Sequence, residues 1–399
     1  MKKIILRSLA VIGILILLFI GVVIYSFVVT TQEKVITTNV NYTGMFSYAP
    51  SGHLLIDVYI NGSDKPYPFI IDNAATTIIF DNLLEELDLN RVAFLPTHDA
   101  NKNISIGSVY RIDTIKLENG IVITDIASKC FSSNFFACND NVYGLIGKEV
   151  LENFVWQFNF KEQTYAVTSD RKNLTFSEDT IEIPFDSASS YHDLIVIKIN
   201  DNQKQVVDID LGSTGGIKYE LEEDSLDYFY KNKNIEILGL TSYGLNGDNK
   251  RENKTSYVFM DSIRIDGNQF YNLESRVANK ALNIVGLEFF KNFRTTLDFP
   301  NKLLILEPND SLNFYSKHFG IAFKMEDKKL RVSSLIENTA PHQFGIKIGD
   351  EVLKLNNLKV DDSFDYCNLD YYKKDTLRVT INAGETIKEY IIAKQYLFN

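Results

Sequence analysis

The sequence has few cysteines, few histidines and no surplus of basic residues, and each shortage excludes a class of function. The five histidines are scattered without the spacing of metal ligands, so we expect no metal site. After residue 30 the chain carries 38 basic residues (41 minus Lys2, Lys3 and Arg7) against 52 acidic ones, a net charge of -14. Such a surface repels phosphate backbones, which argues against a nucleic-acid partner.

Only three cysteines are present, and two of them lie close together. Cys130 and Cys138 fall in the stretch "KCFSSNFFACND", which predicts a loop closed by a disulfide in an oxidising compartment. Two buried thiols are the alternative reading. Cys367 is left over and is expected to be a free thiol.

The first thirty residues lack acidic side chains, and Ser8 to Thr30 lack any charge. At about 1.5 Å per residue, 23 helical residues span a hydrocarbon core of roughly 30 Å. The basic residues before this run predict that residues 1–7 stay in the cytoplasm and that the bulk of the chain is extracytoplasmic, periplasmic or at the cell surface. A cleaved signal peptide is the alternative, but no Ala-x-Ala-like site lies near Thr30. The sequence therefore predicts a single-pass signal anchor over residues 8–30.

A repeat occupies the middle of the chain. "HLLIDVYIN" (53–61) is followed by a turn and "YPFIIDNAAT", while "HDLIVIKIN" (192–200) is followed by a turn and "QVVDIDLGST". In both copies an alternating strand leads through a polar hairpin into a second strand that ends in an aspartate and small residues. These aspartates are Asp72 and Asp210, which lie 138 positions apart.

The ends of the two copies match as well. Gly147 corresponds to Gly286, Phe154 to Phe293 and Phe160 to Phe299, each at an offset of 139. The repeat predicts a mainly β fold with lobe 1 at residues 35–172 and lobe 2 at residues 180–308. Aspartates that only cap turns are the alternative, since Asp before small residues is a common turn signal. Recurrence of the aspartate at one place in both copies favours a paired site.

These motifs resemble those of aspartic proteases of the retropepsin-like and pepsin-like kind. That family places Asp-Thr-Gly-Ser/Ala after a strand in each half, and a later hydrophobic-hydrophobic-Gly strand passes beneath it, as "LIG" (145–147) and "IVG" (284–286) would here. The resemblance implies a bilobal endopeptidase without a cofactor, in which a catalytic dyad activates water to hydrolyse a peptide or protein substrate. The dyad would be Asp72 and Asp210, and the supporting loops would contain Asn73, Ala74, Ala75 and Thr76 in lobe 1 and Leu211, Gly212, Ser213 and Thr214 in lobe 2.

Three positions depart from the family pattern. Asn73 and Leu211 stand where threonines grip across to the other lobe, and Ala74 stands where glycine lets the backbone approach the carboxylates. Asn73 can still form hydrogen bonds, whereas Leu211 cannot. The alternative function is therefore an inactive, protease-like scaffold of the cell envelope that binds peptides. Ser108 to Ile126 is the expected covering hairpin, in which Tyr110 either covers the dyad or packs in the core.

Residues 311–399 form a third expected domain. "NTAPHQFGIKIGDEVLKLNN" (338–357) and "HFGIAF" (318–323) resemble a bacterial PDZ domain, an α+β barrel. The resemblance implies that Phe319, Gly320 and Ile321 form the loop that receives a peptide's C-terminal carboxylate, with the peptide added as an extra strand. A degenerate domain that packs on the protease or closes its cleft is the alternative.

Overall fold

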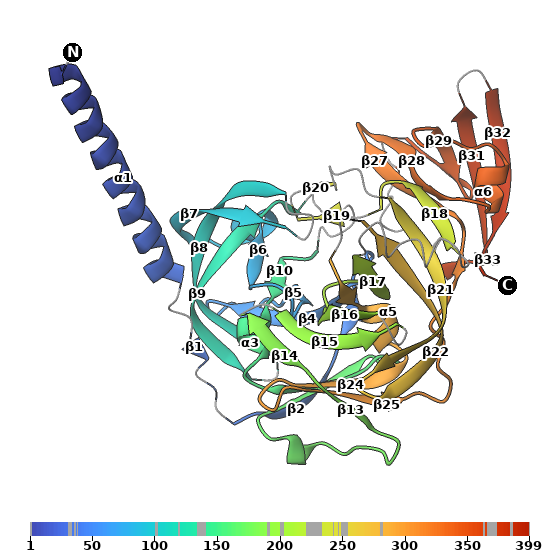
Figure 1. The fold of residues 1–399 in the computed structure, drawn as a ribbon, viewed down its shortest axis with the longest axis horizontal. Coiled ribbons are helices and arrows are strands. Elements are labelled where there is room, and N and C mark those ends of the chain that lie inside the picture. The colour runs from blue at the N-terminus through green and yellow to red at the C-terminus, as the bar shows by residue number, and fades with distance from the viewer. Residues whose placement is uncertain are drawn as a thin grey trace.

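The computed structural model describes residues 2–30, 34–35, 37, 39–99, 103–118, 120–133, 141–189, 192–199, 203–220, 234–241, 243–245, 247–248, 254–279, 282–361, 364, 373–383 and 386–398. Strands dominate this part of the chain, so the prediction of a mainly β protein is confirmed. Figure 1 shows the two lobes side by side, with the C-terminal domain above and beside lobe 2.

Lobe 1 is built on a nine-stranded sheet in the order β1-β9-β6-β10-β5-β4-β8-β7, with β3 paired to β4. In β4, alternate residues such as Leu54 and Ile56 point into the core, as the period of two predicts. The elements are β1 (Lys34–Val35), β3 (Ser47–Tyr48), β4 (Leu54–Ile60), β5 (Tyr67–Ile71), β6 (Ile78–Phe80), α2 (Asp81–Glu86), β7 (Asn90–His98), β8 (Ile104–Leu117), β9 (Val122–Phe131), β10 (Gly144–Ile146) and α3 (Lys148–Leu151).

Lobe 2 repeats this plan, and its sheet continues into the C-terminal domain. The strand order is β14-β15-β16-β23-β17-β22-β21-β18-β28-β29-β31-β32. The lobe 2 elements are β14 (Asp186–Ser189), β15 (His192–Lys198), β16 (Lys204–Ile209), β17 (Ile217–Glu220), β18 (Asn234–Gly239), β19 (Tyr243–Gly244), β20 (Gly247–Asp248), β21 (Thr255–Ile265), β22 (Asn268–Ala278), β23 (Ile284–Val285) and α5 (Leu287–Phe290).

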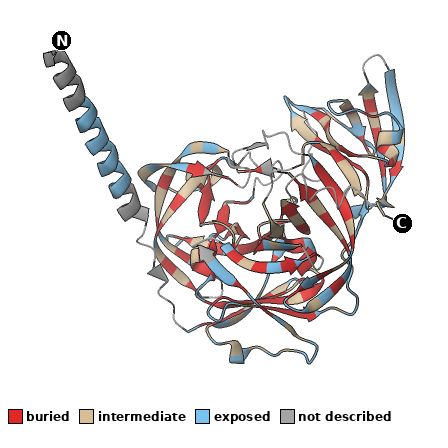
Figure 2. Ribbon diagram, viewed as in Figure 1, coloured by how far each residue is buried: buried red, intermediate tan, exposed pale blue. Residues whose placement is uncertain are grey.

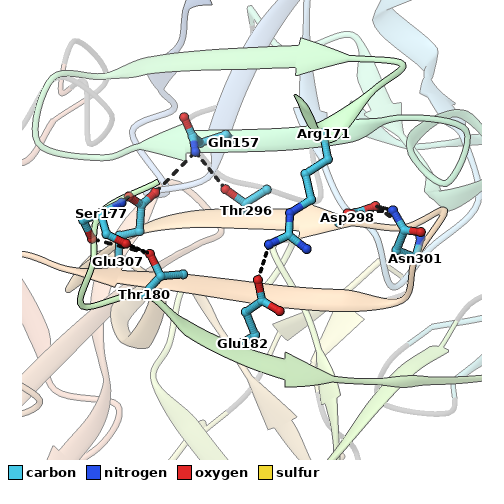
Figure 3. Close-up of polar contacts among 9 residues, drawn as sticks. All are labelled: Gln157, Arg171, Ser177, Thr180, Glu182, Thr296, Asp298, Asn301 and Glu307. Carbon is cyan, nitrogen blue, oxygen red and sulfur yellow. Dashed lines mark hydrogen bonds and ion pairs between the residues drawn. The ribbon is translucent and has the colours of Figure 1, made fainter. Parts of the chain in front are cut away.

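A six-stranded sheet beneath the lobes contains strands from both repeats, in the order β13-β25-β24-β11-β12-β2. At its centre β11 and β24 pair antiparallel, with Gln157 opposite Thr296. These two residues are 139 positions apart, so a local two-fold axis passes between equivalent strands. Gln157 Nε2 donates a hydrogen bond to Thr296 Oγ1 (3.0 Å), and Figure 3 shows the same amide reaching Glu307. The elements are β2 (Asn41–Met45), β11 (Val155–Asn159), β12 (Thr164–Thr168), the 3₁₀ helix η2 (Arg171–Asn173), β13 (Ile181–Pro184), β24 (Phe293–Asp298) and β25 (Leu303–Pro308).

The C-terminal domain has its own core. Its strands surround a buried cluster that includes Phe323, Leu335, Leu355 and Ile381, whereas one larger buried cluster runs through both lobes (Figure 2). Pairing of β18 with β28 connects the domain to lobe 2. The elements are β26 (Lys317–His318), β27 (Ile321–Glu326), β28 (Lys329–Ile336), α6 (Ala340–Gln343), β29 (Glu351–Leu355), β30 (Leu358–Lys359), β31 (Thr376–Ala383), β32 (Thr386–Ala393) and β33 (Gln395–Tyr396).

The N-terminal run forms helix α1 (Lys2–Thr30), which Figure 1 shows extending away from the lobes. Within the described residues, no helix is both long and apolar enough to cross a membrane. The predicted membrane anchor over residues 8–30 is therefore wrong. The predicted extracytoplasmic location and the predicted cytoplasmic tail at residues 1–7 depended on this anchor, so they are not supported either.

Candidate functional site

Asp72 and Asp210 occupy equivalent places at the strand ends of the two lobes. Asp72 follows β5, which pairs in parallel with β10, and its amide donates to the carbonyl of Ile146 (3.1 Å). Asp210 follows β16, which pairs in parallel with β23, and its amide donates to the carbonyl of Val285 (3.0 Å). The sheet register therefore positions both carboxylates in the same way.

A glycine lets the chain pass beneath each aspartate loop. A Cβ at Gly147 would come within 2.6 Å of the Ala75 carbonyl oxygen, and one at Gly286 within 2.7 Å of the Ser213 carbonyl oxygen. The residue after each glycine then donates its amide to the loop, from Lys148 to Ala75 (2.9 Å) and from Leu287 to Ser213 (2.8 Å). The two loops are thus held from below by matching hydrogen bonds.

The two loops also meet across the interface between the lobes. A Cβ at Gly212 would come within 2.7 Å of Asp72 Oδ1 and closer still to Cγ, so the lobe 2 backbone lies directly against the lobe 1 carboxylate. Asn73 accepts a hydrogen bond from the Leu211 amide (2.9 Å) and donates one to the Ile209 carbonyl (2.6 Å). The Asn73 side chain therefore makes both bonds of a tether between the lobes, whereas the apolar Leu211 is buried.

The carboxylates lie partly buried and influence each other. Burial raises the pKa of Asp72 to about 6, with the charges of Asp208 and Glu149 adding to the rise, although the Ala74 amide donates to its Oδ1 (2.9 Å) and opposes it. Burial, followed by the charges of Asp72 and Asp208, raises the pKa of Asp210 well above its usual range. Two carboxylates in such a site share a proton near neutral pH. The Asp210 carboxylate also receives the backbone amides of Gly212 and Ser213.

Asp208 is a third carboxylate of the site that the sequence analysis did not identify. It lies two residues before Asp210, and strand alternation places it on the same side of β16. Its Oδ2 contacts His192 Nδ1, and its Oδ1 accepts the Asp193 amide (3.0 Å). The charged side chain of Asp208 interrupts the apolar strand in "QVVDIDLGST", and this interruption is the feature of the sequence that could have identified it.

His53 is a second residue that sequence reasoning missed, although it opens the repeat and corresponds to His192. Its Nδ1 lies 2.8 Å from Ser51 Oγ, and its ring hydrogen-bonds the backbone of Gly212 in the lobe 2 loop. Burial, opposed by the hydrogen bond to Gly212 and aided by the charge of Lys291, lowers the pKa of His53 to about 4. A neutral His53 therefore supports the glycine that lies against Asp72.

One buried ion pair joins the lobes close to the dyad. Lys148 Nζ lies 2.7 Å from Asp193 Oδ1, and the two side chains are 2% and 0% exposed. The equivalent positions, 139 residues away, are Leu287 and Leu54, both fully buried. The same pair of positions is therefore ionic in one arrangement of the repeat and apolar in the other.

The predicted covering hairpin, Ser108–Ile126, is formed by parts of β8 and β9. Tyr110 packs against the main core, in agreement with the packing alternative. A lobe 2 segment lies nearer the dyad: Leu245, in the turn between β19 and β20, packs with Ala75 against a buried cluster of lobe 1. Figure 1 shows β19 and β20 between the two lobes.

The predicted disulfide is not present in the described structure. Cys130 is a free thiol on β9, and burial raises its pKa to about 11. Cys138 and Cys367 lie outside the described residues.

The predicted carboxylate loop of the C-terminal domain has an unusual backbone. Gly320 has φ +76°, and a Cβ there would come within 2.9 Å of Thr339 Cγ2. Phe319 and Ile321 are buried at the edge of the domain core. Among the described strands β27 pairs only with β28, so its other edge is open beside this loop.

Comparison with protein-family models finds no match to this chain, and a search of curated proteins finds no related sequence. In the described ranges, no three His, Cys, Asp or Glu side chains converge as metal ligands would.

Proposed function

We propose that the protein is an aspartic-type endopeptidase that hydrolyses peptide bonds with water activated by Asp72 and Asp210. The observation that carries this proposal is the meeting of two repeat-related carboxylates at one site, with the Gly212 backbone against Asp72. Nothing in a duplicated β protein with aspartates at turns requires its two copies to bring these groups together.

The raised pKa values supply the protonation states that the reaction needs. Because the charge of Asp72 contributes to the raised pKa of Asp210, Asp72 ionises first and Asp210 keeps the shared proton. Ionised Asp72 takes a proton from water as the water oxygen bonds to the peptide carbonyl carbon, and Asp210 gives its proton to the carbonyl oxygen. The C–N bond then breaks as the nitrogen takes up the proton held by Asp72 and one hydroxyl of the intermediate returns its proton to Asp210, which leaves a carboxylic acid and a free amine. The working range should start near pH 6, where Asp72 ionises, and end where Asp210 does.

The cross-lobe contacts support this function because they hold the carboxylates in fixed positions. The Asn73 side chain pairs with both the Ile209 carbonyl and the Leu211 amide. The apolar side chain of Leu211 therefore leaves neither of these backbone groups without a partner. Preorganisation of this kind is the main protein contribution when no covalent intermediate forms.

A second candidate function is peptide binding without hydrolysis. One observation favours it: Leu245 packs beside the lobe 1 loop. Two features could bind peptide, the site beside this loop and the open edge of β27 next to the Gly320 loop. We propose the latter as a site for a peptide's C-terminus, added as a strand. It is compatible with either function.

The decisive experiment is cleavage of an unbiased peptide library by the full chain from pH 4 to pH 8. Asp72→Asn and Asp210→Asn should each lower the rate of peptide cleavage by ~10²–10⁴-fold, because a general acid or base typically contributes a factor of this size. Asp113→Asn, which removes an exposed carboxylate of β8, is the matched control. Cleavage that survives both dyad substitutions would rule out the mechanism. Peptide binding without cleavage at any pH would favour the second candidate.

A further inference from the structure

Two rows of side chains flank the dyad, one in each lobe. Ile70 lies two residues before Asp72 and Asp208 two residues before Asp210, so strand alternation places each on the same side as the aspartate that follows. Direct register partners on neighbouring strands extend each row. The lobe 1 row is Ile70, Leu145, Ile78 and Lys129, and the lobe 2 row is Asp208, Ile284, Lys218 and Arg276.

The lobe 1 row is apolar next to the dyad. Ile70, Leu145 and Ile78 are buried in a cluster that also includes Phe80 and Phe131. Leu245 of lobe 2 packs against this cluster together with Ala75, a residue of the dyad loop. An aliphatic side chain from outside the lobe therefore already rests on this surface.

The lobe 2 row is ionic in the matching place. Lys218 and Arg276 lie directly opposite each other on parallel strands, where like charges repel. Burial and then the charge of Arg276 lower the pKa of Lys218 to about 8. Arg276 donates to Tyr257 Oη (3.0 Å), and within the described part of the chain neither cation has a carboxylate in ion-pair distance. Asp208, at the other end of the row, is already engaged by His192 and the Asp193 amide.

Two adjacent cations that have no counter-ion among the described residues suit an anionic group, because its charge would offset their repulsion and their partial desolvation. In a peptide that group is the carboxylate of Asp or Glu. This chemistry differs from that of lobe 1, where a carboxylate would be buried among isoleucines at a large cost.

We propose that the cleft distinguishes the two sides of its peptide, binding an aliphatic side chain against the lobe 1 row and an acidic side chain against Lys218 and Arg276. Leu245 is then an internal competitor for the lobe 1 position. This inference rests on the proposed function only in assigning the ligand as a peptide substrate.

The test measures binding, so that it does not depend on catalysis. Fluorescence anisotropy at pH 6.5 follows labelled peptides bound to the full chain carrying Asp72→Asn and Asp210→Asn. The peptides differ only at two adjacent central positions, which are Leu-Asp, Leu-Lys or Ser-Asp, each in both orders. One order of the Leu and Asp pair should bind at least tenfold more tightly than the Leu-Lys and Ser-Asp peptides.

Substitutions assign each half of this preference to its lobe. Lys218→Glu should reverse the preference between Asp and Lys and leave the preference for Leu unchanged, whereas Lys204→Glu, on the exposed start of β16, should change neither. Leu245→Ser should increase the affinity for Leu peptides severalfold, with the exposed Leu358→Ser as control. If Lys218→Glu does not fold, Arg276→Gln should still weaken binding of the acidic peptide.

Equal affinity for the Asp and Lys peptides, or the same preference in Lys218→Glu, would overturn the inference about lobe 2. An unchanged affinity for Leu peptides in Leu245→Ser would overturn the role of the lobe 1 row. Cleavage by the unsubstituted chain without such preferences would leave the proposed hydrolysis intact. The preferences without cleavage would leave the inference intact and count against hydrolysis.

Discussion

Lobe 1 and lobe 2 share one backbone plan but differ in the side chains that carry out equivalent tasks. Lys148 of lobe 1 corresponds to Leu287, and Asn73 corresponds to Leu211. In both pairs lobe 1 supplies the polar member, which bonds to lobe 2. The two-fold axis gives two equivalent positions for each of these polar contacts between the lobes. In this protein each contact forms at one of the two positions, the one where lobe 1 supplies the polar side chain.

The comparison separates backbone requirements from side-chain roles. Gly147 and Gly286 are both glycine because any Cβ would collide with the loop above. The positions of Lys148 and Leu287 carry no such backbone constraint, and their chemistry differs.

The largest effect is expected where the two loops differ in a single methyl group. Gly212→Ala should lower the rate of peptide hydrolysis at least ~100-fold, because the methyl group would displace the Asp72 carboxylate. The reciprocal change, Ala74→Gly, should alter the rate less than about threefold, since it removes atoms and adds no collision. Steady-state kinetics on the best library peptide measure both, with thermal melts to verify folding. Equal losses in the two variants would contradict the asymmetry of the loops.

Breaking the buried ion pair should have the largest effect on stability. Lys148→Leu leaves Asp193 buried without its counter-ion and should lower the free energy of unfolding by about 3–5 kcal/mol. The double variant Lys148→Leu with Asp193→Leu should recover most of this loss, because it copies the apolar residues, Leu287 and Leu54, at the equivalent positions. Urea denaturation gives these values. A double variant no more stable than the single one would show that the ion pair cannot be replaced in this way.

The dyad should make stability depend on pH. Unfolded aspartate ionises near its usual pKa of 3.8, whereas Asp72 in the folded chain keeps its proton until about pH 6, so the folded state binds more protons between these values. Stability from this source therefore falls as pH rises from about 4 to 6. Relative to the unsubstituted chain, Asp72→Asn should gain on the order of 2 kcal/mol between pH 4 and pH 7. A difference between the two proteins that does not change with pH would contradict the raised pKa.

Substitution of His53 should have the smallest effect on stability at neutral pH. The contribution of His53 to the pH dependence of stability should be opposite in sign to that of Asp72. Its pKa of about 4, below the usual 6.5, means that the folded state binds fewer protons between these values, so stability falls as the pH drops through this range. His53→Gln keeps a donor toward Gly212 and should cost less than about 1 kcal/mol at pH 7. Denaturation at pH 7 and pH 4.5 compares it with His53→Leu, which lacks the donor. Unchanged acid sensitivity in His53→Gln would exclude His53 as its source.

Several local features could be predicted from sequence because they depend on neighbouring residues. Alternation in "HLLIDVYIN" predicts a strand, and Asp72 and Asp210 each follow the strand that their apolar run predicts. The offset of 139 between the repeats recurs in the register of Gln157 with Thr296. Hydropathy alone was misleading for the N-terminal run, where the apolar character of residues 8–30 predicted an anchor that the described helix does not support.

The mainly β strand pattern, the duplication and the pair of aspartates follow from the sequence, because side-chain periodicity and glycine requirements are set within a few residues. The pairing of Lys148 with Asp193, the support of Gly212 by His53 and the packing of Leu245 on the opposite lobe become visible in the folded chain alone. Lys148 and Asp193 are 45 positions apart in the sequence, and His53 and Gly212 are 159 positions apart. These contacts form because packing the two lobes about their axis buries polar groups that must then find partners, and no local pattern specifies which partner lies within reach.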